Sequence, residues 1–320
     1  MTFSKQQLKI ALVSIFLLTA MPVFAKELHF SFTPYAGLEQ STFQEAYYYE
    51  DFSRYKDRQC SLLEWTQKLS YLAGIETRVK YKKLSFFIDL STKLPGKCGS
   101  MMDSDYLENG MKFNYSISEN HLNSAFDAQT GFSYEVDLPF MQITPSITAS
   151  YSYISFSAKN GRGWYGDSSY TSDGKTHSWD SPYSHYFPDG KYHLAGVDYL
   201  NQTFYFMTGL ELSKNFIKEW RTGLGFHFAP FTYSYTKDHH LGKNKNFYTE
   251  GYIYNYFGNM KFTFQNDFTI SSLISINTRM ELNLQLFTKG KTDKNGRPNQ
   301  QQEGESYSAF KTKIGISFNL

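Results

Sequence analysis

The stretch "DFTISSLISINTRMELNLQL", residues 267–286, alternates apolar and polar side chains over twenty positions. Its even positions are mostly apolar, as at Phe268, Ile274 and Leu282, whereas its odd positions are mostly polar, as at Asn277 and Glu281. Because successive side chains of a strand point to opposite faces, one face suits lipid and the other suits a polar interior. Strands of soluble sandwiches rarely keep such alternation over this length. The stretch therefore predicts a strand of a membrane β-barrel.

Similar alternation recurs along the chain and gives ten predicted strands with 267–286 included, an even number as in bacterial barrels. The other nine are residues 28–45, 59–81, 85–95, 121–136, 140–158, 191–213, 217–238, 247–264 and 310–320. We predict an all-β fold, a ten-stranded antiparallel transmembrane β-barrel whose last strand closes on the first.

The predicted connections are of two kinds. Four are short, at 82–83, 137–139, 214–216 and 265–266, and five are long and polar, at 46–58, 96–120, 159–190, 239–246 and 290–305. Short turns inside and long loops outside are typical of outer-membrane barrels, so we expect long extracellular loops.

The first 25 residues are set apart from the predicted barrel, which occupies residues 26–320. Lys5 and Lys9 precede an apolar run from Ile10 to Leu18, and Ala25 ends a segment typical of a cleaved secretory leader. Without the leader the 32 basic residues become 30, equal to the 30 acidic ones. Such a chain, balanced in charge and secreted, is not expected to bind nucleic acid. Its 18% aromatic content at a mean hydropathy of −0.48 fits aromatic girdles at two membrane interfaces.

The segment 217–238 changes phase at Pro230. Before the proline the apolar residues stand at even positions, as at Phe226, and after it they stand at odd positions, as at Tyr233. Since proline cannot donate a ladder hydrogen bond, a one-residue bulge would explain the switch. Beyond the bulge His239 then points outward. The residues predicted to face the interior are Thr232, Ser234, Thr236, Asp238 and His240.

Two pairs of ionisable residues could carry chemistry. In "TYSYTKDHHLG", residues 232–242, Asp238 could orient His240 to take a proton from water, although a solvated polar rim is the alternative. In "KCGSMMDSDYLENG", residues 97–110, Asp103 and Asp105 have the same spacing. Two carboxylates this close raise the pKa of one of them and could hold a water or a metal. The alternatives are a plain acidic loop, or a calcium site that lacks the spacing of a standard calcium loop.

Several motifs resemble the omptin family of outer-membrane endopeptidases. "SLLEW" at 61–65 is similar to the family's Ser-x-Leu-Asp-Trp, and "GSMMDSDYL" at 99–107 is similar to its Gly-Asn-Met-Val-Asp-x-Asp-Trp-Met. "YFPDGKYHLAGVDYLNQTF" at 186–204 resembles its Phe-Pro-Asn-Gly segment and the Tyr-x-Gln that follows. "KDHH" at 237–240 stands where omptins have Asp-Glu-His. The likeness extends over nearly the whole chain after the leader.

The resemblance implies an aspartic-type endopeptidase with its site in an extracellular groove. Asp103 and Asp105 match the family's aspartate couple, and Asp238 and His240 match its Asp–His dyad. The implied mechanism holds a water between the two couples. It needs no covalent intermediate, no cofactor and no metal. The implied partners are a peptide or protein substrate at the extracellular face and the lipid of the outer membrane.

The resemblance also implies a substrate pocket with two carboxylates that favours basic residues. Glu45 in "STFQEAYYY" matches one of the acids, with a solvated strand end as the alternative. The second acid stands two residues before the dyad aspartate, and that position is Thr236. We therefore expect a broader preference than the family has.

Omptins also bind lipopolysaccharide phosphates through outward basic residues, several of them on the fifth strand. Here that strand carries Tyr151 and Tyr153, with Lys159 and Arg162 beyond its predicted end. The expectation is weak or absent dependence on lipopolysaccharide.

Cys60 and Cys98 are the only cysteines and fall near the outer ends of two predicted hairpin neighbours. A disulfide between them is one interpretation in an oxidising compartment, and two separate thiols are the other. Two other functions remain open. The barrel could be a catalytically inactive adhesin or binding protein, or a porin whose predicted inward charges, such as Glu64, Lys68 and Glu281, pair across the lumen.

Overall fold

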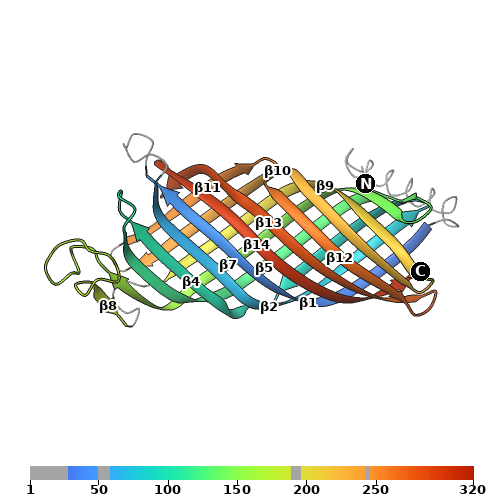
Figure 1. Ribbon diagram of the computed structural model, residues 1–320, viewed down its shortest axis with the longest axis horizontal. Helices are drawn as coiled ribbons and strands as arrows, with labels where there is room; N and C mark the ends of the chain where they lie inside the picture. Colours follow the sequence, from blue (N-terminus) through green and yellow to red (C-terminus); the bar gives the residue numbers. More distant parts are fainter. Residues whose placement is uncertain (1–27, 50–57, 189–195, 243–244) are drawn as a thin grey trace, which may run out of the picture.

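The computed structural model describes residues 28–49, 58–188, 196–242 and 245–320 (Figure 1). The leader at 1–25 and parts of the expected loops lie outside the described residues. The described elements are strands: β1 (Leu28–Tyr48), β2 (Gln59–Tyr81), β3 (Leu84–Lys93), β4 (Gly96–Tyr106), β5 (Lys112–Tyr134), β6 (Val136–Asp137), β7 (Gln142–Tyr165), β8 (His185–Phe187), β9 (Val197–Ile217), β10 (Trp220–Gly242), β11 (Lys245–Asn255), β12 (Asn259–Thr269), β13 (Ile274–Lys294) and β14 (Arg297–Asn319). Among these residues, none forms a helix with the length and apolar character needed to span a membrane.

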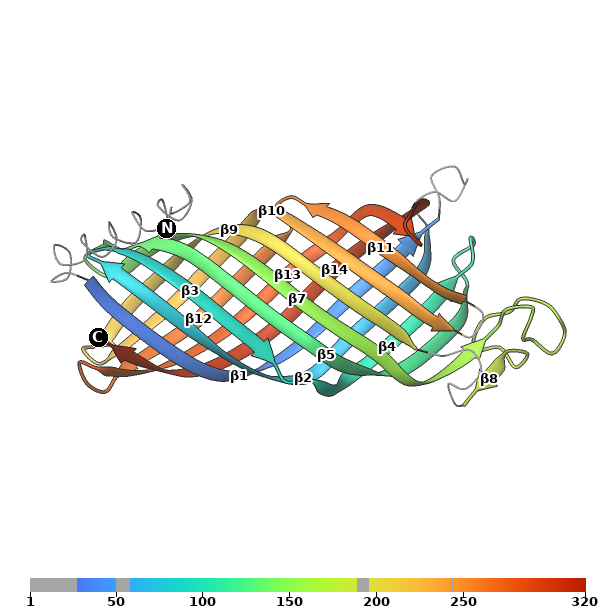
Figure 2. The same ribbon diagram turned by 180° about the vertical axis from the view of Figure 1, so that it is seen from behind.

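The strands close into an antiparallel barrel, which Figures 1 and 2 show from opposite sides. β3 and β4 both pair with β2 and β5, and β11 and β12 both pair with β10 and β13, so each couple acts as one interrupted strand. With β6 and β8 as short additions, the described strands form a ring of ten. β1 pairs with β14, as predicted, through partners such as Glu39 and Lys311. The predicted fold class is confirmed.

The outer surface carries a belt of exposed apolar side chains, as the alternation predicted. Phe226 on β10, Phe262 on β12 and Leu282 on β13 are all more than a third exposed. On β10, the row of outward-facing side chains continues from this belt through the partly buried Tyr235 to Lys237. A belt bounded by aromatic residues is the lipid-facing surface of a transmembrane barrel. The residues of β10 that follow Tyr235 therefore lie outside the apolar belt.

The two ends of the barrel differ. The C terminus lies at one end, here called the short-turn end, and β8 lies at the other, here called the loop end (Figure 1). Inside, an aromatic layer and an ion-pair layer fill the barrel. Trp65 stacks on Tyr199 at a centroid distance of 5.4 Å, and both are almost fully buried. Lys93 Nζ lies 2.6 Å from Glu39, and Lys311 Nζ lies within 3.3 Å of Glu39.

Two of the predicted short turns are wrong in position. The turn expected at 214–216 lies at 218–219, between β9 and β10. The turn expected at 265–266 lies at 270–273 instead, so the quoted stretch 267–286 covers the end of β12 and much of β13. Phe268 pairs with Ile276, and residues paired directly across a hairpin share a face. Because both have even numbers, the alternation continues through the turn unchanged and cannot locate it.

The expected long loops 96–120 and 290–305 are largely strand, and the one expected at 159–190 begins later than predicted. The expected loop 96–120 contains β4 and the start of β5, and β7 continues to Tyr165. The expected loop 290–305 contains the outer ends of β13 and β14, joined at Asn295 and Gly296, whose φ angles are 51° and 72°. An Asn-Gly pair with positive φ is the preferred two-residue hairpin turn. The strands thus extend beyond the apolar belt at the loop end.

Candidate active site

A bulge on β10 sets the orientation of the dyad. The register between β10 and β9 shifts between Phe228 and Phe231, as predicted at Pro230. Beyond it Thr232, Ser234 and Thr236 are buried in the interior, and Asp238 follows in the same row. Lys237 and His239 alternate with this row and belong to the outward one.

Asp238 and His240 are in direct contact. Nε2 of His240 lies 2.7 Å from Oδ2 of Asp238, whose side chain is fully buried, while the imidazole is 29% exposed. The imidazole also stacks on Phe247, at a centroid distance of 4.5 Å and an interplanar angle of 17°. The ring is thus held on one side by a carboxylate and on another by an aromatic face, and part of it opens to solvent.

Asp103 and Asp105 lie on β4, beside one another on the interior face. Asp103 pairs with Leu63 on β2 and with Ser116 on β5. Asp105 accepts a hydrogen bond of 3.2 Å from Nδ2 of Asn114. Oδ1 of Asp103 is buried and accepts no hydrogen bond within the described part of the chain. The couple therefore retains an unused acceptor.

The two couples are close enough to influence each other's protonation. Burial, then the charge of Asp105, raise the pKa of Asp103 to about 8, with His240 opposing and Asp238 adding to the rise. Burial alone lowers the pKa of His240, but the charge and hydrogen bond of Asp238 outweigh it and raise that pKa to about 9. The four groups face one interior space beyond the belt, and their titrations are linked.

A buried group of acidic side chains, here called the acidic pocket, lies beside the dyad and is built from residues far apart in sequence. Thr236 donates a short hydrogen bond to Glu303 on β14. Tyr47 donates to Glu45 at 2.6 Å and to Glu303 at 3.3 Å. Gly251 on β11 leaves the room for this, since a Cβ there would collide with Glu303 and Thr236.

The pocket holds carboxylates without a neutralising cation in the part of the chain that the structure describes. Glu45 and Glu303 are fully buried, and Oε2 of Glu45 accepts no hydrogen bond from described residues. Burial, then the charges of Asp238 and Glu303, raise the pKa of Glu45 well above its usual value. Burial raises the pKa of Glu303 to about 8, with Glu305 and Asp238 adding to it. A buried group of acids with raised pKa values favours a cationic ligand.

Sequence reasoning found Glu45 and Thr236 but missed Glu303. Residues 290–305 read as a polar loop, although Glu303 and Glu305 continue the interior parity of Lys311 and Lys313. The expectation that the pocket has only one carboxylate, because Thr236 stands in place of an acid, is wrong. Glu303 on β14 supplies a second carboxylate and accepts a hydrogen bond from Thr236.

Two further expectations from the sequence, a disulfide and the position of two basic residues, are not met by the structure. Cys60 and Cys98 are free thiols, so the disulfide is not formed. Gly99 pairs with Gln67, which sets the neighbouring Cys98 about eight residues, or about 25 Å, along β2 from Cys60. Disulfides require Cα atoms less than about 7 Å apart. Lys159 and Arg162 lie on β7, not beyond its end.

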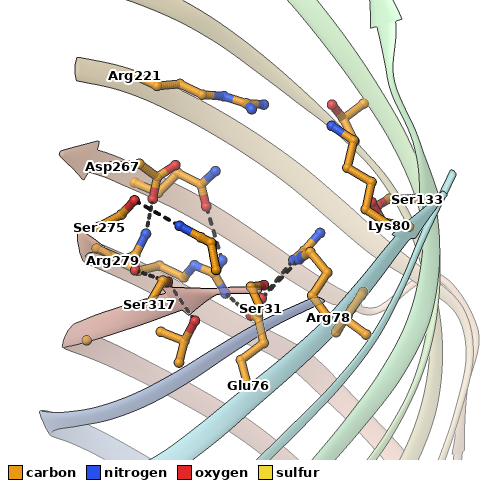
Figure 3. A pocket seen from close by; sticks show the side chains of 18 of the residues that line it. Ser31, Glu76, Arg78, Lys80, Ser133, Arg221, Asp267, Ser275, Arg279 and Ser317 are labelled. Carbon is orange, nitrogen blue, oxygen red and sulfur yellow. Dashed lines mark hydrogen bonds and ion pairs between the residues drawn. The ribbon is translucent and has the colours of Figure 1, made fainter. Parts of the chain in front are cut away.

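A cavity of about 1240 Å³ opens at the short-turn end and is shown in Figure 3. Its charges are mostly paired: Arg78 lies 2.9 Å from Glu76, and Arg279 lies 3.4 Å from the same carboxylate. The two interior layers described above separate it from the dyad. In the described part of the chain, no group of three or more His, Cys, Asp or Glu side chains is placed to hold a metal ion.

Comparison with known proteins defines the fold. No protein-family profile and no curated protein matches the chain. Among solved structures, the outer membrane protease OmpT from Escherichia coli superposes with a TM-score of 0.78 at 15% identity, over 91% of this chain and 97% of that one. The chain has an outer-membrane β-barrel fold.

Other bacterial outer-membrane barrels match more weakly. OprG from Pseudomonas aeruginosa gives a TM-score of 0.30 at 9% identity, over 91% of this chain and 95% of that one. The translocator domain of the autotransporter NalP from Neisseria meningitidis gives 0.31 at 7% identity, over 97% of each chain.

Proposed function

We propose that this chain is an omptin-like endopeptidase of the outer membrane, with the loop end and its site facing the outside of the cell. The observation that carries the proposal is the contact of 2.7 Å between His240 and Asp238, close to the partly buried couple Asp103 and Asp105. A carboxylate-oriented imidazole opposite a protonated carboxylic acid has the parts needed for general acid–base hydrolysis. The barrel fold shared with a protease of known structure agrees with the proposal.

The mechanism follows from the roles of the four groups. Nε2 of His240 is engaged by Asp238, so Nδ1 is the ring nitrogen left to accept a proton from the attacking water. The water oxygen bonds to the scissile carbonyl carbon, and the carbonyl oxygen becomes an oxyanion. Asp103, protonated near neutral pH because of its raised pKa, donates a hydrogen bond, and Asp105 holds the water. The imidazolium then protonates the departing amine as the C–N bond breaks.

We propose that the acidic pocket beside the dyad takes a basic side chain of the substrate. Glu45 and Glu303 are fully buried and have raised pKa values, so an incoming Lys or Arg would pair with carboxylates that the described residues leave without a cation. The absence of an acid at position 236 is offset by Glu303. A preference for basic residues replaces the broader preference expected from Thr236.

A binding protein without activity is the alternative that one observation favours. At the loop end Tyr115, Trp164 and Trp179 pack together, with Tyr115 to Trp179 at 4.9 Å between ring centroids. Tyr186, at 4.9 Å from Trp164, is 43% exposed. Exposed aromatic clusters are common at protein-binding surfaces. A porin is not favoured, because the interior layers fill the lumen and Glu64 faces outward, where it accepts a hydrogen bond from Gln44.

The test is cleavage of peptides with basic residues by refolded protein. His240→Ala should lower kcat by about 10³-fold or more, because it removes the base. His239→Ala is the matched control on the same strand, and its outward position predicts a mild effect. Both variants should keep the heat-modifiable mobility of the folded barrel. Absence of cleavage by the wild type, or equal losses in both variants, would contradict the proposed function.

A further inference from the structure

A tyrosine of β7 faces the aspartate couple from the neighbouring wall of the barrel. Asp105 on β4 pairs with Asn114 on β5, and Asn114 pairs with Tyr165 on β7. Directly paired residues share a face of the sheet, so Tyr165 points into the interior in the same row as Asp105. One row deeper, Asp103 pairs with Ser116, and Ser116 pairs with Gly163.

Gly163 allows the ring of Tyr165 to lean toward the deeper row. A Cβ at position 163 would lie 2.8 Å from Cε2 of Tyr165 and 3.1 Å from Cβ of Ser116. The phenol ring therefore covers the glycine, next to the serine that pairs with Asp103. Edge-on contacts to Tyr170 at 5.6 Å and to Phe187 at 5.4 Å hold the ring in this position.

The hydroxyl group of Tyr165 is left without a hydrogen-bond partner among the described residues. It makes no hydrogen bond with the residues that the structure describes, although the nearby Asn114 donates to Asp105. Burial, then the charges of Asp103 and Asp105, raise the pKa of Tyr165, so the phenol remains protonated over the whole working range of pH. It is a neutral donor near the aspartate couple, with its ring held by the contacts to Tyr170 and Phe187.

We infer that Tyr165 is a catalytic residue of the proposed hydrolysis, whose hydroxyl donates a hydrogen bond to the scissile carbonyl oxygen as that oxygen becomes the oxyanion. The inference rests on the proposed function. The tyrosine keeps its proton, so the stoichiometry of the reaction is unchanged. Fixed donors placed where charge develops lower the barrier because they need no rearrangement during the reaction. Asp103 alone is an unreliable donor, since it becomes an anion as the pH passes its pKa of about 8.

The test compares Tyr165→Phe with Tyr170→Phe, which removes a hydroxyl from the same aromatic group in the loop after β7. Tyr165→Phe should lower kcat by about 10²–10³-fold and leave KM within threefold, as for the loss of one oxyanion donor. A peptide phosphonate, whose tetrahedral anionic centre mimics the intermediate, should bind more weakly by a similar factor. Tyr170→Phe should change neither quantity by more than threefold.

The outcomes separate this inference from the proposed function. Cleavage by the wild type together with an unaffected kcat in Tyr165→Phe would overturn the inference and leave the protease intact. Equal losses in the two variants would show that the aromatic group acts by packing alone, which also overturns it. A KM effect without a kcat effect would assign Tyr165 to ground-state binding and likewise refute the oxyanion role. No cleavage by the wild type would overturn both proposals.

Discussion

Replacing Glu303 with Gln tests whether the carboxylate from β14 determines the substrate preference. The side chain keeps its shape and can still accept the hydrogen bond from Thr236. What it loses is the negative charge that would meet a basic side chain. A hydrogen bond between charged groups contributes about 1.5–3 kcal/mol, which corresponds to roughly 10- to 150-fold in affinity.

The size of the effect depends on pH because Glu303 is protonated in the free site. Its pKa is raised to about 8, so at pH 7 the carboxyl must lose a proton before it can pair with a cation. One unit of pKa costs about 1.4 kcal/mol, which cancels much of the gain at pH 7. Above pH 8 the group is already ionised and the cost disappears. We therefore expect a large effect of Glu303→Gln at pH 9 and at most about a tenfold effect at pH 7.

The assay is the ratio of kcat/KM for two peptides that differ only in Arg or Gln before the scissile bond. Taking the ratio cancels the titration of the catalytic groups, which is common to both peptides. At pH 9 Glu303→Gln should lower the ratio roughly 10- to 100-fold. Glu305→Gln is the matched control, since Glu305 accepts hydrogen bonds from Asn201 and Gln285 instead of Thr236.

The control also has a predicted sign. The charge of Glu305 raises the pKa of Glu303, so Glu305→Gln should not lower the preference for Arg. An unchanged ratio in Glu303→Gln at pH 9, in a wild type that prefers Arg, would refute the assignment of Glu303. A wild type with no preference for Arg would refute the pocket as a whole.

Three further predictions concern the site and the outer surface. Hydrolysis needs a neutral His240 as the base and a protonated Asp103 as the acid. With pKa values of about 9 for His240 and about 8 for Asp103, kcat/KM should be maximal between pH 8 and 9 and at least about tenfold higher there than at pH 6. A flat profile of kcat/KM from pH 6 to 8 would contradict these two roles. Cys60 and Cys98 should both react with a maleimide when the protein is unfolded without reductant, and addition of reductant should leave Tm unchanged. Failure of both thiols to react with the maleimide would show a disulfide. Lipopolysaccharide should activate the detergent-solubilised protein only weakly. Lys159 lies opposite Glu119 in the register of β5 and β7, and Lys97 forms an ion pair with Glu119, so this carboxylate reduces the attraction of the surface for phosphates. Many-fold activation would refute this.

Alternation along the chain was enough to predict the barrel and the face on which each side chain lies. Alternation depends only on the local geometry of a strand, so it fixed which residues face lipid wherever one face is apolar. The same rule, applied across the phase change at Pro230, placed Asp238 and His240 together in the interior and His239 in the outward row. These are properties of consecutive residues in one strand, and they need no knowledge of the neighbouring strands.

The ends of the strands, and the strands that meet at the site, could not be predicted from alternation because they depend on contacts between strands. Beyond the apolar belt both faces of a strand are polar, so the alternation disappears, and the outer ends of β4, β13 and β14 looked like loops. The contact of Thr236 with Glu303 and the position of Tyr165 in the row of Asp105 both depend on the register between strands. Register is set by turn positions and bulges along each hairpin, and alternation cannot locate a turn that preserves the parity of the residues on both sides, as the turn at 270–273 does. The chain therefore reveals the face of each side chain, while the closed barrel alone determines its neighbours.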